Sequence, residues 1–112
     1  LPGGAQEIHE SPKIAAIREC KEETGFDITI EDLIGVYSSA CYEYINYPWK
    51  DDKWVHLVFT AKIIGGVATT SDETSSVKWF DRDKLPEFSD GHDVRVEQGF
   101  KWYDGVREVY YE

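Results

Sequence analysis

The spacing of hydrophobic and polar residues predicts helices and strands mixed along the chain. Ser11 followed by Pro12 predicts a helix start, because a Ser hydroxyl can accept a hydrogen bond from the first turn while Pro has no amide hydrogen to lose there. Gly25 predicts the end of this helix. At about 100° per residue, one side of the helix is mostly apolar. That side carries Ile14, Ala16, Ile17, Cys20 and Thr24.

After Gly25 the pattern changes to the alternation that is typical of strands. Phe26, Ile28 and Ile30 alternate with polar residues and predict a short half-buried strand. Further elements are predicted as a strand over 33–40, a strand over 54–64, a strand over 77–80, a helix over 93–103 and an extended segment over 106–111. The strands over 33–40 and 54–64 are expected to pair as a hairpin across a polar and aromatic loop.

The other side of the first helix is acidic, with Glu19, Glu22 and Glu23 inside an arc of roughly 100°. These like charges are neighbours in the half of the helix where the macrodipole disfavours anions, and each such contact costs up to about 1 kcal/mol. Ala15 lies in the same arc and leaves room for another group to approach. A solvated acidic face is the simplest interpretation. A divalent cation would instead turn the repulsions into attractions, and oxygen ligands without a nearby Cys or His favour Mg²⁺ or Mn²⁺ over zinc.

The segment from Gly4 to Phe26 resembles the signature of the Nudix (MutT-like) hydrolases, G-x5-E-x7-R-E-U-x-E-E-x-G-U, where U is a bulky apolar residue. Its fixed positions are occupied by Gly4, Glu10, Arg18, Glu19, Cys20, Glu22, Glu23, Gly25 and Phe26. A chance match has a frequency on the order of one in a billion per starting point. Glu7 also agrees with the common form. His9 departs from it, because many members carry Gly there, and Cys20 is smaller than the usual Leu or Val.

This resemblance implies a fold and an activity. The implied fold is an α/β/α sandwich with a mixed β-sheet, in which residues 1–112 form one Nudix domain and further strands are expected before residue 1. The implied activity is metal-dependent hydrolysis of a nucleoside diphosphate linked to another group, as in ADP-ribose, dinucleoside polyphosphates or nucleoside triphosphates. Water attacks a phosphorus of the pyrophosphate, helped by one or more Mg²⁺ or Mn²⁺ ions.

The resemblance also implies roles for individual residues. Glu10 and Arg18 are expected to pair and so to hold the loop against the helix. Gly25 is expected to end that helix. Any one of the three helix acids can alternatively orient or deprotonate the attacking water, with Glu22 and Glu19 the foremost candidates. The expected metal-binding groups are Glu19, Glu22, Glu23 and the backbone of Gly4.

Two further groups are candidates for the site. Glu73 precedes Trp79-Phe80 and resembles the downstream acid of many Nudix enzymes, where it is a ligand or the base; a solvated loop acid is the alternative. Aromatic residues gather in the predicted hairpin loop, and ordinary packing explains at least half of them. The sharper hypothesis is a surface on which a base or nicotinamide stacks. Its candidate residues are Tyr42, Tyr44, Tyr47 and Trp49.

Charge and composition restrict the partners. The net charge of −10, from 22 acidic and 12 basic side chains, disfavours nucleic-acid polymers and leaves a phosphorylated small molecule as the expected partner. No apolar run approaches the ~20 residues of a membrane span, so no membrane partner is expected. Two cysteines suit a reduced compartment, and the sequence predicts a cytoplasmic protein. The resemblance adds a possible homodimer.

Two other functions remain open. A Nudix-fold module that binds a nucleotide without cleaving it usually lacks acids of the motif, whereas this chain keeps all of them. Isomerisation of an isoprenoid diphosphate on a related scaffold needs additional catalytic groups that the sequence does not identify.

Overall fold

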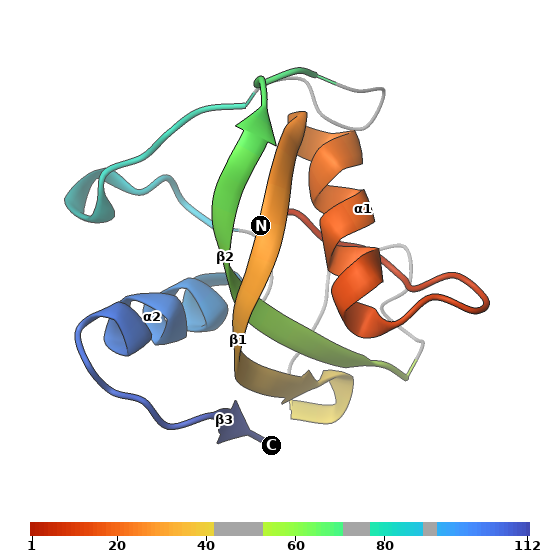
Figure 1. Ribbon diagram of the computed structural model, residues 1–112. Coiled ribbons are helices and arrows are strands. Elements are labelled where there is room, and N and C mark those ends of the chain that lie inside the picture. Colours follow the sequence, from red (N-terminus) through yellow and green to blue (C-terminus); the bar gives the residue numbers. More distant parts are fainter. Residues whose placement is uncertain (42–52, 71–76, 89–91) are drawn as a thin grey trace. The chain divides into compact units, whose positions relative to one another are not determined.

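The computed structural model describes residues 1–41, 53–70, 77–88 and 92–112. The main elements are α1 (Pro12–Thr24), β1 (Phe26–Ser38), β2 (Val55–Gly66), α2 (His92–Tyr103) and β3 (Tyr110–Tyr111) (Figure 1). Single turns of 3₁₀ helix lie at Ser39–Cys41 and Arg82–Lys84. The chain divides into two compact units, residues 1–31 with 61–85 and residues 32–60 with 86–112. None of the described helices is long and apolar enough to cross a membrane.

The ends of α1 follow from local chemistry, as the sequence predicts. The Ser11 hydroxyl accepts a hydrogen bond from the Ile14 N–H at 3.3 Å, and Pro12 occupies the first turn. Gly25 closes the helix in the left-handed conformation, at φ 84°, and its N–H donates to the Lys21 carbonyl. A side chain at Gly25 would overlap the Val67 carbonyl, so both the turn and its surroundings require glycine.

The strands form one sheet in the order β2-β1-β3. β1 and β3 are parallel, with Gly35 opposite Tyr110 and Val36 opposite Tyr111, whereas the arrows of β1 and β2 run in opposite directions in Figure 1. The sheet is therefore mixed, which with the helices confirms the α/β class. The predicted strands over 26–30 and 33–40 are one continuous strand, and the loop of the predicted hairpin lies outside the described residues.

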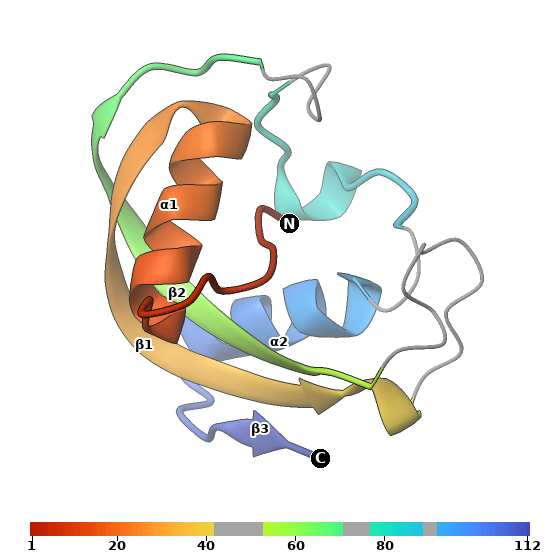
Figure 2. The same ribbon diagram turned by 90° about the vertical axis from the view of Figure 1, so that its right-hand side faces the viewer.

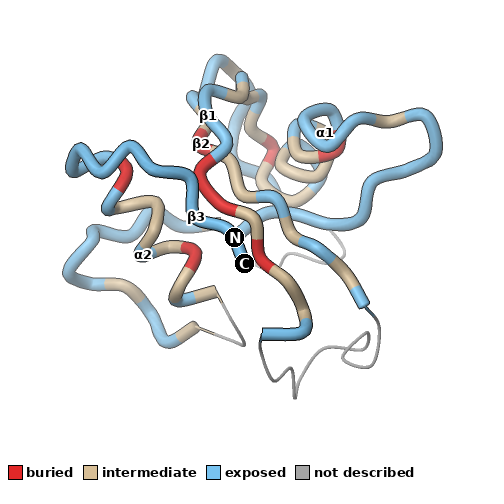
Figure 3. Tube along the Cα trace, turned by 90° about the horizontal axis from the view of Figure 1, so that it is seen from below, coloured by how far each residue is buried: buried red, intermediate tan, exposed pale blue. Residues whose placement is uncertain are grey.

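Each unit has its own helix against part of the sheet. In the first unit, α1 lies beside the first half of β1, and Ala15 is its buried side chain (Figure 2). In the second unit, Ile34 and Tyr37 of β1 and Trp102 of α2 are buried, and Figure 3 shows buried positions on both elements. Gly99 of α2 faces Ile34, because a Cβ there would contact the Ile34 side chain at 3.9 Å.

Two expectations about local structure are wrong. Residues 77–80 form no strand. The Trp79 ring centre lies 5.6 Å from that of Phe26, but Trp79 is largely exposed. In α1, Ala15 was expected to leave room for another group beside the acids, but it is buried, with 5% of its surface exposed. The loop before the helix lies on this acidic side, where the Gly3 N–H donates to Glu23 and the Gly4 backbone lies against Glu19.

Candidate metal and catalytic site

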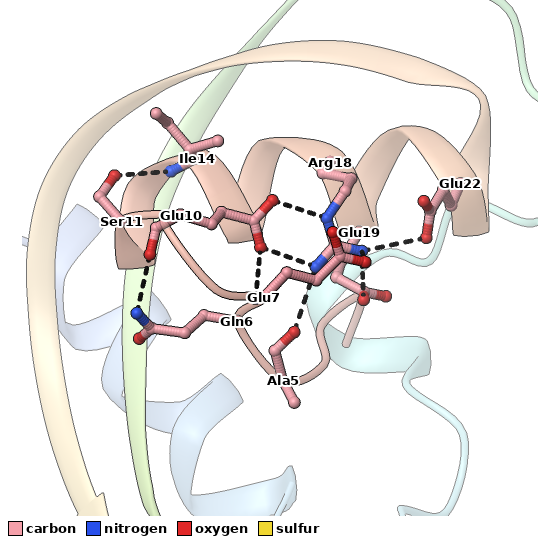
Figure 4. Close-up of polar contacts among 9 residues, drawn as sticks. All are labelled: Ala5, Gln6, Glu7, Glu10, Ser11, Ile14, Arg18, Glu19 and Glu22. Atoms are coloured by element: carbon pink, nitrogen blue, oxygen red, sulfur yellow. Dashed lines mark hydrogen bonds and ion pairs between the residues drawn. The ribbon is translucent and has the colours of Figure 1, made fainter.

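Arg18 joins the first loop to α1 through one edge of its guanidinium group (Figure 4). Its Nε donates to Glu10 Oε2 at 2.7 Å, and its Nη2 donates to Glu10 Oε1 at 2.9 Å and to the Ala5 carbonyl at 3.1 Å. The pair expected between Glu10 and Arg18 is therefore present. The guanidinium, together with a hydrogen bond from the Glu7 N–H, lowers the pKa of Glu10 to about 2, and the paired carboxylate raises the pKa of Arg18.

The remaining nitrogen of Arg18 faces the helix acids. Nη1 lies 2.8 Å from Glu19 Oε1 and 3.3 Å from Glu22 Oε2. The Glu19 side chain is only 15% exposed, whereas that of Glu22 is 59% exposed. Nη1 thus contacts the carboxylates of both Glu19 and Glu22, and that of Glu22 remains accessible to solvent.

The loop backbone approaches the other side of the acids. The Gly3 N–H donates to Glu23 Oε2 at 2.7 Å. A Cβ added at Gly4 would lie 2.6 Å from the Glu19 carboxyl carbon and 2.7 Å from one of its oxygens. A side chain at position 4 would therefore displace the Glu19 carboxylate from its place beside this backbone.

A tight turn holds the loop in place. The Glu10 N–H donates to the Glu7 carbonyl at 3.1 Å, and the Glu7 N–H donates to Glu10 Oε1 at 2.9 Å. His9 lies within this turn at φ 69°, in the left-handed region that glycine occupies most easily. This backbone conformation explains why many Nudix proteins carry Gly at the position of His9.

The donor set fits a hard divalent cation, although its groups are not arranged as a closed cage. Across residues 1–41, 53–70, 77–88 and 92–112, no three His, Cys, Asp or Glu side chains are positioned to hold a metal ion together. Arg18 lies against Glu19 and Glu22, and Glu23 is turned towards Gly3. All the donors are carboxylate oxygens, and the backbone at Gly4 forms a close cradle beside Glu19, which suits Mg²⁺ or Mn²⁺.

The other candidate residues are not placed at the site. Glu73 and the aromatic candidates of the hairpin loop, Tyr42, Tyr44, Tyr47 and Trp49, all lie outside the described residues. Trp54, at the end of that loop, stacks on His56 in the second unit, with ring centres 3.8 Å apart.

The second unit contains a buried cation that the sequence analysis did not single out. Arg95 of α2 is 4% exposed, and its guanidinium lies 5.6 Å from the Tyr37 ring and 5.9 Å from the Trp54 ring. Burial, followed by the charges of Arg95 and His92, lowers the pKa of His56 to about 4. A single Arg among polar and apolar helix residues gives no signal in the sequence that it would be buried.

Comparisons with known proteins identify the family. A NUDIX domain model matches residues 1–102. The chain is 33% identical over 107 residues to an ADP-ribose pyrophosphatase of Methanocaldococcus jannaschii, covering 94% of this chain and 59% of that protein. It is 32% identical over 109 residues to a putative 8-oxo-dGTP diphosphatase of Bacillus subtilis (strain 168), covering 97% and 66%.

A solved structure gives the same result. The crystal structure of a UDP-X diphosphatase superposes with a TM-score of 0.84 at 27% identity, over all of this chain and 54% of that chain. The chain thus spans between half and two thirds of the length of these relatives. With the model match over most of its length, it belongs to the NUDIX domain family.

Proposed function

We propose that the protein is a metal-dependent hydrolase that cleaves the pyrophosphate bond of a nucleoside diphosphate linked to another group. The observation that carries this proposal is the arrangement around Arg18. One edge of its guanidinium fixes Glu10 and the loop, while Nη1 gathers the carboxylates of Glu19 and Glu22 beside the backbone of Gly4. The names of the relatives support the reaction class.

In this proposal the acids of α1 have distinct tasks. Glu19, Glu22 and Glu23 would hold Mg²⁺ or Mn²⁺ with the backbone at Gly4, and the cation supplies charge neutralisation and activation of water. Glu22, the more exposed acid, is available to accept the proton of the attacking water. A bond forms between the water oxygen and phosphorus, and the anhydride P–O bond breaks. Glu10 and Arg18 position the loop but do not contact the reacting atoms.

The substrate class follows from what the relatives share. Their names refer to ADP-ribose, 8-oxo-dGTP and a UDP derivative, all of which are nucleotides with a phosphoric anhydride bond. A small nucleotide derivative also agrees with the net charge of −10, because a cation is needed to bring its phosphates to an acidic surface.

The test is hydrolysis of a panel containing ADP-ribose, NADH, a UDP-sugar, dinucleoside polyphosphates and 8-oxo-dGTP, with Mg²⁺ or Mn²⁺. We expect turnover of at least one substrate, reduced about 100-fold or more in Glu22→Gln because proton transfer or cation binding is lost. Glu31→Gln, an exposed change on β1 in the same unit, is the matched control and should retain activity. Nucleotide binding without turnover, unchanged by Glu22→Gln, would favour the non-catalytic module.

A further inference from the structure

Glu7 has no assigned role, but its carboxylate meets the same nitrogen of Arg18 as the helix acids. Glu7 Oε1 lies 3.8 Å from Arg18 Nη1, which also contacts Glu19 and Glu22 (Figure 4). Three carboxylates from two different segments, the loop and α1, therefore converge on one cationic atom. Such convergence is costly without additional positive charge.

The backbone of Glu7 is fixed, although its side chain is open. Its N–H and carbonyl are both bonded to Glu10, and Glu10 is held by two nitrogens of Arg18. The Glu7 side chain is 69% exposed and makes only the longest of the Nη1 contacts. It is thus anchored at the edge of the acid group with freedom to move towards a bound cation.

We propose that Glu7 is an additional carboxylate of the cation site, positioned to hold the hydrated cation on the side of the loop. Mg²⁺ usually keeps several of its waters, so an acid at the rim can act through a water as well as through its charge. Arg18 Nη1 holds these carboxylates together, and a bound divalent cation would take over these contacts while Glu10 keeps the guanidinium in place. This inference rests on the proposed function.

The experiment measures Mn²⁺ binding directly, by the electron paramagnetic resonance signal of free Mn²⁺, with the full chain and without nucleotide. We expect Glu7→Gln to raise the dissociation constant about tenfold, since an outer carboxylate is lost while the ligands of α1 remain. Glu31→Gln removes the same charge from β1. It should change the Mn²⁺ dissociation constant less than about twofold in 0.1 M salt, where distant charges are screened. Thermal unfolding in EDTA should be the same for both variants, because the Glu7 backbone bonds do not depend on its side chain.

Two results would overturn the inference, and they are distinguishable. If Mn²⁺ binding is lost in Glu22→Gln but equal in Glu7→Gln and Glu31→Gln, Glu7 has no part in the site and the proposed function is retained. If the unmodified chain binds no Mn²⁺ at all, the metal-dependent function fails together with the role of Glu7.

Discussion

The two sides of the Arg18 guanidinium contact different acids of the signature. One edge holds Glu10 in a bidentate pair, and the opposite nitrogen contacts Glu19 and Glu22. The sequence predicts that Glu10 and Arg18 pair, because the resemblance covers both residues. It does not predict the contact of Arg18 with the helix acids, because that depends on how the guanidinium turns once Glu10 is bound.

Gly4 offers the sharpest test among single residues. Gly4→Ala places a methyl group 2.6 Å from the Glu19 carboxyl carbon, and this carboxyl can move away because it is the end of a flexible side chain. We expect hydrolysis to fall at least about tenfold while the midpoint of thermal unfolding changes little, since about 1 Å of misplacement is expensive in catalysis. Steady-state kinetics and thermal melts measure the two effects.

Gly3→Ala is the matched control, because a Cβ at Gly3 would meet nothing within 4 Å. It should leave the hydrolysis rate within about twofold of the unmodified chain, because the added methyl group contacts nothing and the Gly3 N–H can still donate to Glu23. Equal losses of activity in Gly3→Ala and Gly4→Ala would show that the approach of Gly4 to Glu19 is not what matters.

The elements show which sequence signals are reliable. The bounds of α1 follow from Ser11-Pro12 and Gly25, because capping is local chemistry. Glu31 and Asp32 interrupt the alternation of polar and apolar residues, so the sequence predicted two strands where β1 is continuous. At this point the Asp32 N–H donates to the Thr60 hydroxyl. The burial of Ala15 was not predictable from periodicity, because it depends on how other parts of the chain pack against α1.

From the Glu10–Arg18 pair, which joins the loop to α1, we predict that the free energy of unfolding depends on pH. The pKa of Glu10 is about 2 in the folded chain, below its ordinary value of 4.5. Because the folded value is the lower one, the Glu10 interaction is fully present above about pH 4.5 and is lost as the pH falls through about 2. The difference in free energy of unfolding between the unmodified chain and Glu10→Gln should therefore be constant near neutral pH and shrink below about pH 4.5.

Denaturant unfolding at a series of pH values measures this difference, with Glu31→Gln as a control that keeps the Glu10 pair. A difference of the same size at about pH 2.5 and at neutral pH would contradict a stabilising ionised Glu10, because protonation removes its charge.

For the whole molecule, family and fold class were predictable from one short motif, whereas substrate and assembly were not. The motif acids are chemically constrained, and the NUDIX domain match over residues 1–102 confirms the family they predicted. The aromatic residues proposed for nucleotide stacking and Glu73 lie outside the described residues, so their roles stay predictions. The homodimer and the cytoplasmic location also stay predictions. With a net charge of −10, the proposed divalent cation would offset the charge of both the acids and a phosphorylated substrate.

The most direct test of the central claim is the metal dependence of nucleotide hydrolysis. The purified chain is treated with EDTA, assayed on the best substrate of the panel, and assayed again after excess Mg²⁺ is added. The account predicts no turnover in EDTA and recovery with Mg²⁺ in the unmodified chain and in Glu31→Gln, but not in Glu19→Gln, whose carboxylate lies against Gly4. Hydrolysis that continues unchanged in EDTA, or full recovery in Glu19→Gln, would contradict it.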